Sequence, residues 1–322
     1  MSHSGIRRFA VEHVSEFRYS EAARGSVLTL RLKPRTDARR QLLGFSLDVD
    51  PRAAPTAYRD AFSNACHLVN IHREHRHTLV RSAARVEIAD TRGPAAAAEN
   101  ATWDAVRALS DPVRHWEYLA PSRLAFPCPA LDDFVGAHRI DRGDDPLAAL
   151  RNAASNLRAA FTYELGTTGV DSTLEQILET GRGVCQDYSH VMLAIARSWG
   201  IPSRYVSGYV QTERECSDVG EAGASHAWAE CLLPGLGWVG VDPTNESVGD
   251  LWHIPVAVGR DYIDAAPTRG TVFGGGESRL EVRVSVRESE ALTSASAAVP
   301  TRGPALRRLA PGPLAHRAAS DQ

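Results

Sequence analysis

One cysteine of this 322-residue chain stands in a setting that suits a nucleophile. Residues 181–190 read GRGVCQDYSH, so Cys185 follows a Gly-Arg-Gly turn. Apolar residues then recur at every third or fourth position until Gly200 and Pro202 end the run, which predicts a helix that begins at or near Cys185. Unpaired backbone N–H groups and the positive end of the helix dipole favour an ionised thiol there, and the same amides can stabilise an oxyanion.

A thiol nucleophile works with an imidazole that takes its proton and a carboxylate that orients the imidazole. The stretch SHAWAECLL places His226 on a predicted strand, and GWVGVDPT places Asp242 at the end of the next one. The segment LPGLG between them suits a hairpin, and antiparallel pairing would bring His226 near Asp242. The sequence therefore predicts a triad of Cys185, His226 and Asp242, with the cysteine helix packed across the two strands.

Neighbouring residues have weaker claims to chemistry. Tyr163, Trp228 and Gln186 are candidates for lining the cleft or the oxyanion site, although core packing explains the two aromatic residues as well. The helix dipole alone favours an acidic residue in the first turn, which explains Asp187. His190, five residues after the cysteine, is predicted to pack behind the site.

No metal or other cofactor is expected. The stretch IHREHRH at 71–77 holds three histidines and a glutamate, but strand alternation divides them between two faces and the order H-E-x-x-H is missing. The cysteines are odd in number, widely spaced and without a C-x-x-C pair, so they are expected to be free thiols. The four cysteines other than Cys185 are predicted to be chemically inert: Cys66, Cys128, Cys216 and Cys231.

The periodicity of apolar residues changes near residue 99, and the patterns on the two sides predict the elements that position the triad. Residues 6–90 show the short-period alternation of strands, which predicts a β-rich domain over residues 1–92, and residues 91–98 read as a linker. Helical patterns and then alternating segments follow, which predict a core over residues 99–287. Residues 288–322 are rich in Ala, Pro, Ser and Gly and are predicted to be a disordered tail. The expected fold class is α+β.

Composition excludes several classes of protein. The 36 Lys and Arg against 39 Asp and Glu give a formal net charge of −3, which offers no electrostatic case for binding nucleic acid or an anionic membrane. No apolar run approaches the roughly 20 residues of a membrane span, and the first residues lack the apolar stretch of a secretory signal. The sequence predicts a cytoplasmic protein.

Three blocks of the sequence resemble one known family. GRGVCQDYSHVMLAIARSWGIPSRYVSGYV, SHAWAECLLPGLGWVGVDPTN and HIPVAVGRDY are similar to the bacterial transglutaminase-like family, and LRLKPR and DAFSNACHLVNI to its N-terminal domain. The resemblance implies a papain-like core in which Cys185 is the nucleophile, His226 the base and Asp242 the orienting carboxylate. DYSH is a mild variant of the more usual DFAH.

The resemblance implies attack on a carboxamide or peptide carbonyl of a peptide or protein, through a thioester that water or an amine then resolves. A peptidase, an amide hydrolase and an amine transferase all remain open. The main alternative is a peptide-binding or assembly module that keeps the fold without turnover. Acyl transfer as in arylamine acetyltransferases also uses Cys–His–Asp, but those enzymes differ around the cysteine and lack a comparable first domain. The substrate, the oligomeric state and the role of the first domain stay open.

Overall fold

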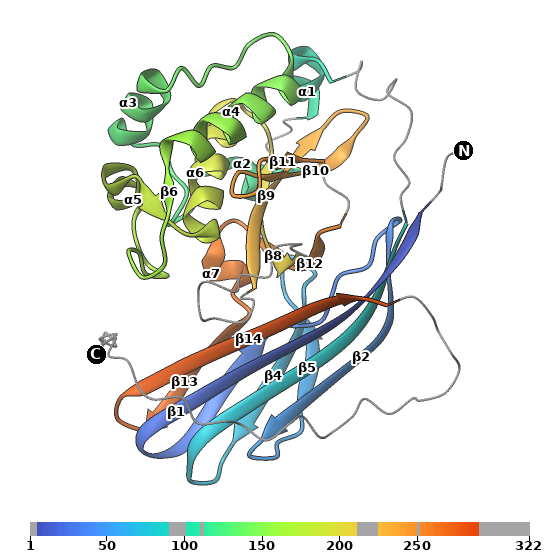
Figure 1. The fold of residues 1–322 in the computed structure, drawn as a ribbon, viewed down its shortest axis with the longest axis vertical. Helices are drawn as coiled ribbons and strands as arrows, with labels where there is room; N and C mark the ends of the chain where they lie inside the picture. Colours follow the sequence, from blue (N-terminus) through green and yellow to red (C-terminus); the bar gives the residue numbers. More distant parts are fainter. Residues whose placement is uncertain (1–4, 90–100, 110–112, 211–224, 250–251, 290–322) are drawn as a thin grey trace.

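The computed structural model describes residues 5–89, 101–109, 113–210, 225–249 and 252–289, which form a long curved sheet beneath a helix-rich core (Figure 1). The fold class is α+β, as predicted. The long sheet has the order β2-β5-β1-β4-β3, and β13 and β14 also pair with β1. Its strands are β1 (Ile6–Leu30), β2 (Arg40–Asp50), β3 (Thr56–Arg59), β4 (Ala65–Ile71), β5 (His75–Ala89), β13 (Thr268–Gly274) and β14 (Ser278–Glu288).

The last two strands of the long sheet come from the far end of the chain. The core predicted over residues 99–287 includes the segment that holds β13 and β14, and both strands pair antiparallel with β1 of the long sheet. The first half of β1 lies between β5 and β14, and its second half between β4 and β13. Alternation in the sequence identifies a strand but not the sheet that it joins, so this pairing could not be predicted. The predicted linker at 91–98 and all but the first two residues of the tail at 288–322 lie outside the described residues.

The core is a five-stranded antiparallel sheet, order β11-β10-β9-β8-β12, with helices on one face. Its strands are β8 (Ser203–Tyr209), β9 (His226–Leu233), β10 (Gly237–Asp242), β11 (Ser247–Val248) and β12 (Ile254–Gly259). The helices are α1 (Trp103–Leu109), α2 (Trp116–Leu119), α3 (Pro129–Ala137), α4 (Pro146–Ala160), α5 (Leu174–Thr180), α6 (Cys185–Ser198) and α7 (Tyr262–Ala265). Among the described helices, none has both the length and the apolar character that crossing a bilayer requires.

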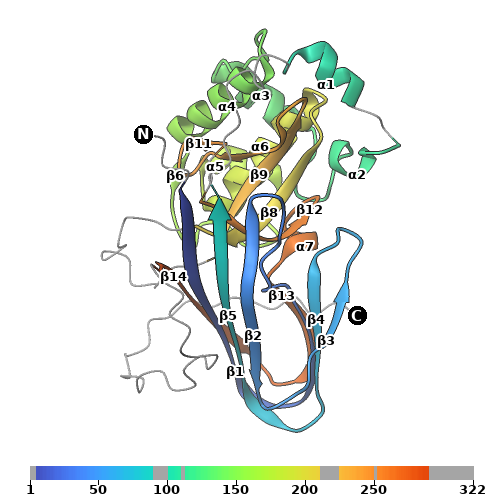
Figure 2. The ribbon, with the colours of Figure 1, turned by 90° about the vertical axis from the view of Figure 1, so that its right-hand side faces the viewer.

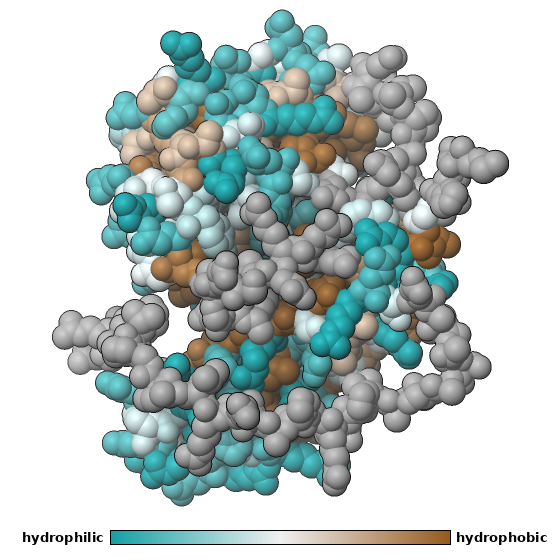
Figure 3. All heavy atoms as spheres, viewed as in Figure 1, coloured by the Kyte–Doolittle hydropathy of each residue, from teal (hydrophilic) through white to brown (hydrophobic). Residues whose placement is uncertain are grey.

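Helix α6 is buried along most of its length, as the apolar spacing after Cys185 predicts. It packs on the face of β9 that carries Ala227, Ala229 and Cys231. The long sheet packs against the edge of the core sheet formed by β8 and β12, where Phe9 and Val86 contact residues of these two strands. Figure 2 shows the long strands running beneath this edge of the core. In Figure 3, hydrophilic residues cover the lower end of the long sheet, and hydrophobic ones gather nearer the junction.

A glycine on the neighbouring strand makes room for the indole of Trp228 on β9. Gly208 lies on the neighbouring strand β8, and a Cβ there would stand 2.3 Å from the carbonyl oxygen of Ile254 and 2.6 Å from the Trp228 ring. At Gly240, on β10, a Cβ would lie 3.8 Å from the same ring, which is an ordinary contact. The core sheet thus accepts a fully buried tryptophan because β8 carries no side chain at Gly208.

Gly208→Ala is therefore expected to destabilise the fold by about 2–4 kcal/mol, since backbone and indole must both move. Denaturant unfolding of the variant would measure this change. Gly136→Ala is the matched control, because the site on helix α3 is exposed and a Cβ there meets nothing within 4 Å. That substitution should raise the free energy of unfolding by about 0.5–1 kcal/mol. Equal effects at the two positions would contradict the packing argument.

Candidate active site

Cys185 occupies the first position of α6, and the residues before it build the turn that presents its thiol. Helix α5 ends at Gly181, whose φ of +59° reverses the chain. Gly183 then has no room for a side chain, because the Asp187 carboxylate folds back across it, with Oδ2 2.5 Å from an ideal Cβ. That oxygen accepts a 2.7 Å hydrogen bond from the backbone N–H of Val184 and a 2.6 Å bond from the Thr168 hydroxyl.

Asp187 is thus a structural residue of the helix start, as its place in the first turn suggests. Its side chain is fully buried, and burial raises the pKa of its carboxyl group. The hydrogen bond to Val184 satisfies one of the backbone N–H groups that a helix leaves unpaired at its N-terminus. Asp187 therefore holds the loop that carries Cys185.

His226 and Asp242 meet where β9 and β10 lie side by side. The imidazole Nε2–H donates to Asp242 Oδ2 over 2.7 Å. The other carboxylate oxygen, Oδ1, accepts from the backbone N–H of Thr244 at 3.1 Å and of Asn245 at 3.3 Å. The chain just after β10 therefore fixes the orientation of the carboxylate, and the carboxylate fixes the imidazole.

The charges at this site reinforce one another. Burial alone would lower the pKa of His226, but the charge and hydrogen bond of Asp242, together with a hydrogen bond to the Cys185 side chain, raise it to about 10. Burial would likewise raise the pKa of Asp242, but the cationic His226 beside it holds that pKa far below its usual range. Because Nε2 is committed to Asp242, Nδ1 is the ring nitrogen left for the thiol. The structure therefore brings the three predicted residues together.

Two further side chains on the carboxylate went unnoticed in the sequence. His253 lies just before β12, and its Nε2–H donates to Asp242 Oδ2 over 2.9 Å. Asn245 donates its Nδ2–H to the same oxygen over 2.8 Å. The block HIPVAVGRDY begins with His253, but its residue pattern alone predicts no role for this histidine. Asn245 could have been suspected, since residues just after an aspartate at a turn often bond to it.

The three cleft candidates occupy different positions around the triad. Trp228 is 1% exposed, and its ring lies 6.1 Å from that of His226 at an interplanar angle of 23°. It therefore supports the imidazole from within the core. Tyr163 is 44% exposed, on the short strand β6 (Thr162–Tyr163), and pairs with Gly183 of β7 (Arg182–Gly183), two residues before Cys185. Gln186 is half-buried in the first turn of α6.

The other histidines that stood out in the sequence have structural partners. His190 is fully buried, accepts the backbone N–H of Tyr262 at its Nε2 over 3.2 Å, and has a pKa lowered to about 3 by burial. In the 71–77 stretch, His75 contacts the Ser26 hydroxyl at 2.9 Å, whereas His77 pairs with Asp50 at 3.1 Å. His75 and His77 thus form separate contacts with different residues.

One group of side chains in the described part of the chain has the composition of a metal site. The ligand atoms of His226, Asp242 and His253 all lie within 4.8 Å of one another. Two imidazoles and a carboxylate could bind a divalent cation such as Zn²⁺. A cation would have to replace both imidazole N–H hydrogen bonds to Asp242, and these bonds already account for the arrangement of the three residues.

Each of the two parts of this chain matches a known protein family. Residues 136–243 match the transglutaminase-like superfamily, and residues 9–87 match the bacterial transglutaminase-like N-terminal region. The protein ML0607 of Mycobacterium leprae is 33% identical over 281 residues, which cover 87% of this chain and 98% of that one. A protein-glutamine gamma-glutamyltransferase of Pseudomonas aeruginosa is 32% identical over 106 residues, covering 30% of this chain and 15% of that protein.

The fold is also found in a solved structure. A candidate cysteine protease from Cytophaga hutchinsonii superposes with a TM-score of 0.70 at 17% identity, covering 89% of this chain and 92% of that one. The likeness extends over both the long sheet and the core. By sequence, the chain belongs to the transglutaminase-like superfamily.

Proposed function

We propose that this protein is an enzyme that cleaves or transfers amide bonds through a thioester on Cys185. The observation that supports this most directly is the position of His226, which bonds to Asp242 through Nε2 and interacts with the Cys185 side chain. The raised pKa of His226 favours a resting state in which the imidazole holds the proton of the thiol. In such an ion pair the sulfur is nucleophilic without the help of a metal ion.

In the first half of the reaction, the Cys185 sulfur attacks the carbonyl carbon and the C=O π electrons move onto oxygen. The backbone N–H of Cys185, at the N-terminus of α6, is placed to stabilise this oxyanion. The tetrahedral intermediate then collapses, the C–N bond breaks, and His226 gives its proton to the departing amine. A thioester on Cys185 remains.

In the second half, water or an amine attacks the thioester while His226 accepts its proton. The C–S bond breaks, and the sulfur leaves as a thiolate beside the restored imidazolium. Water gives a carboxylic acid, and an amine gives a new amide. The proposed substrate is a peptide or protein, and Tyr163 at the rim of the site is the proposed contact for it. The proposed location is the cytoplasm.

Thiol labelling tests the nucleophile without knowledge of the substrate. At about pH 6, where an ordinary thiol is almost fully protonated, iodoacetamide should label Cys185 at least about 100-fold faster than a cysteine in a short peptide. Cys231 is the internal control, because burial raises its pKa to about 12. Mass spectrometry of the labelled peptides would locate the modification. A Cys185 no faster than the peptide thiol would exclude an activated nucleophile and favour a binding module.

The two possible acceptors can be separated by product mass. Peptides that contain glutamine and peptides that lack it would be incubated with the protein, each with and without a primary amine. Hydrolysis adds water to the acyl fragment, whereas transfer adds the amine. If Cys185 is labelled fast but neither product forms, the substrate belongs to a class that the peptide panel does not contain.

A further inference from the structure

Asp242 is shared by two histidines, and the mechanism above uses only one of them. His253 donates to the same Oδ2 that receives the proton of His226, over 2.9 Å and 2.7 Å respectively. His253 is 5% exposed, and its ring lies 4.7 Å from that of Trp228 in an edge-on arrangement. A buried imidazole that donates to a buried carboxylate has a fixed ring orientation.

The position of Oδ2 decides whether His226 can act. The backbone of residues 244 and 245 anchors Oδ1, but a carboxylate held at one oxygen can still turn about its Cβ–Cγ bond. His253 and Asn245 hold the second oxygen. Asn245 is exposed to solvent, whereas His253 is packed in the core. The buried donor is therefore the firmer of the two anchors.

His253 owes its own position to the long N-terminal sheet. The Arg40 guanidinium donates through Nε to the His253 carbonyl over 3.0 Å. Two residues further on, the carbonyl of Pro255 accepts the backbone N–H of Arg35 at 2.8 Å. The strand that begins there, β12, is the edge strand of the core sheet beside β8, so its outer backbone groups need partners.

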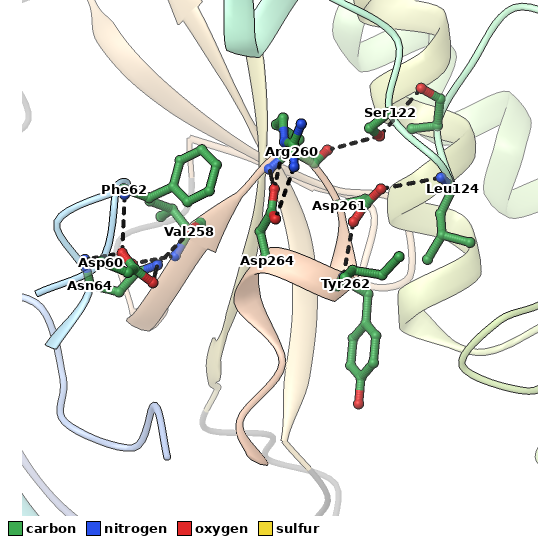
Figure 4. Close-up of polar contacts among 12 residues, drawn as sticks. Asp60, Phe62, Asn64, Ser122, Leu124, Val258, Arg260, Asp261, Tyr262 and Asp264 are labelled. Atoms are coloured by element: carbon green, nitrogen blue, oxygen red, sulfur yellow. Dashed lines mark hydrogen bonds and ion pairs between the residues drawn. The ribbon is translucent and has the colours of Figure 1, made fainter. Parts of the chain in front are cut away.

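Asn64 completes the attachment of β12 with both ends of its amide. Its Oδ1 accepts the Val258 N–H at 2.8 Å, and its Nδ2 donates to the Val258 carbonyl at 2.7 Å (Figure 4). Asp60 orients the amide, accepting from Nδ2 at 3.0 Å. Asn64 thus takes the place of a neighbouring strand, and it is fully buried.

From these contacts we propose that His253 is a positioning residue for the reaction, which fixes Asp242 Oδ2 toward His226, and that the N-terminal sheet holds His253 in place through β12. The proposal rests on the function proposed above. It gives the first domain a task in the chemistry of the second, since Arg40 and His253 are 213 residues apart in sequence. His253 does not touch the substrate in this scheme.

The test compares His253→Leu with His253→Gln, using iodoacetamide labelling of Cys185 at about pH 6. The leucine removes the donor and should slow labelling about tenfold, the effect of losing one hydrogen bond to a charged group. Glutamine carries an N–H donor close to the Nε2 position and should restore most of the rate. With a turned-over substrate, the leucine variant should lose kcat with an unchanged KM.

Arg40→Ala tests the contribution of the N-terminal sheet. It should slow Cys185 labelling about threefold to tenfold, because the His253 carbonyl loses one donor. Arg59→Ala is the matched control, since Arg59 lies in the same sheet and bonds to the Ser63 carbonyl, and its rate should stay at the wild-type value. Circular dichroism would show whether each variant is folded. If His253→Leu does not fold, the labelling rates of His253→Gln and Arg40→Ala still test the proposal.

The outcomes separate this proposal from the proposed function. A wild-type Cys185 without enhanced labelling would refute the function, and the positioning role with it. A fast wild-type Cys185 with equally fast His253→Leu would leave the function standing and overturn the positioning role. A slow His253→Leu with Arg40→Ala equal to Arg59→Ala would overturn the part assigned to the N-terminal sheet.

Discussion

Cys185→Ala is expected to lower amide turnover by at least about 10⁴-fold, because the triad then lacks the sulfur that forms the thioester. The fold should survive, since the thiol is partly exposed at the first position of α6 and its removal opens no buried cavity. The free energy of unfolding should therefore stay within about 1 kcal/mol of the wild-type value. Steady-state rates on a peptide amide and denaturant unfolding of the same preparation would measure both effects.

Cys128→Ala is the matched control for this loss. Cys128 is 7% exposed, is the N-cap residue of α3 and belongs to the hydrophobic core around the helices. Its replacement should cost about 1–2 kcal/mol of stability but leave the rate per folded molecule within about twofold. If Cys185→Ala kept more than a few per cent of the wild-type rate, covalent catalysis by this thiol would be refuted.

The triad could be predicted because each of its signals is local. The glycine turn and the apolar spacing after Cys185 describe one helix start, and this is where the structure places it. His226 and Asp242 lie 16 residues apart on strands joined by a short turn, so pairing of neighbours brings them into contact. The α+β class follows from the same local patterns.

The contacts of His253 and the course of the last strands could not be predicted, because they depend on long-range pairing. β12 pairs with β8 and not with β10, so the contact that His253, just before β12, makes with Asp242 does not follow from the pairing of neighbouring strands. The alternation in SRLEVRVSVRE identifies β14 as a strand, but only the length of β1, 25 residues, leaves an edge for it in the long sheet. Sequence periodicity carries no information about which edge is open.

Asp242→Asn should slow turnover about 10³–10⁴-fold, although the two side chains have nearly the same volume. Asparagine can still accept a hydrogen bond from His226, but it has no charge with which to stabilise an imidazolium. Burial then dominates and lowers the pKa of His226 from about 10 to below its ordinary value of 6.5. At neutral pH the imidazole would be uncharged, and labelling of Cys185 at about pH 6 should fall toward that of an ordinary thiol.

The same substitution has a signed effect on stability. The pKa of His226 is higher in the folded protein than its ordinary 6.5, so its contribution is complete below pH 6.5 and is lost as the pH rises through about 10. The pKa of Asp242 is depressed from 3.8, so its contribution is present above pH 3.8 and is lost as the pH falls through the folded value. The pair therefore stabilises the fold most between pH 3.8 and 6.5.

Urea unfolding of Asp242→Asn and its parent, both carrying Cys185→Ala so that the thiol does not ionise, would measure this effect. The difference in free energy of unfolding should be largest near pH 6 and should shrink as the pH rises further, because Asp242 still raises the pKa of His226 in the parent, and only the parent then loses a bound proton above pH 6.5. A difference that stayed constant or grew would mean that Asp242 does not hold the proton on His226. The ion pair on which the proposed reaction depends would then lack its support.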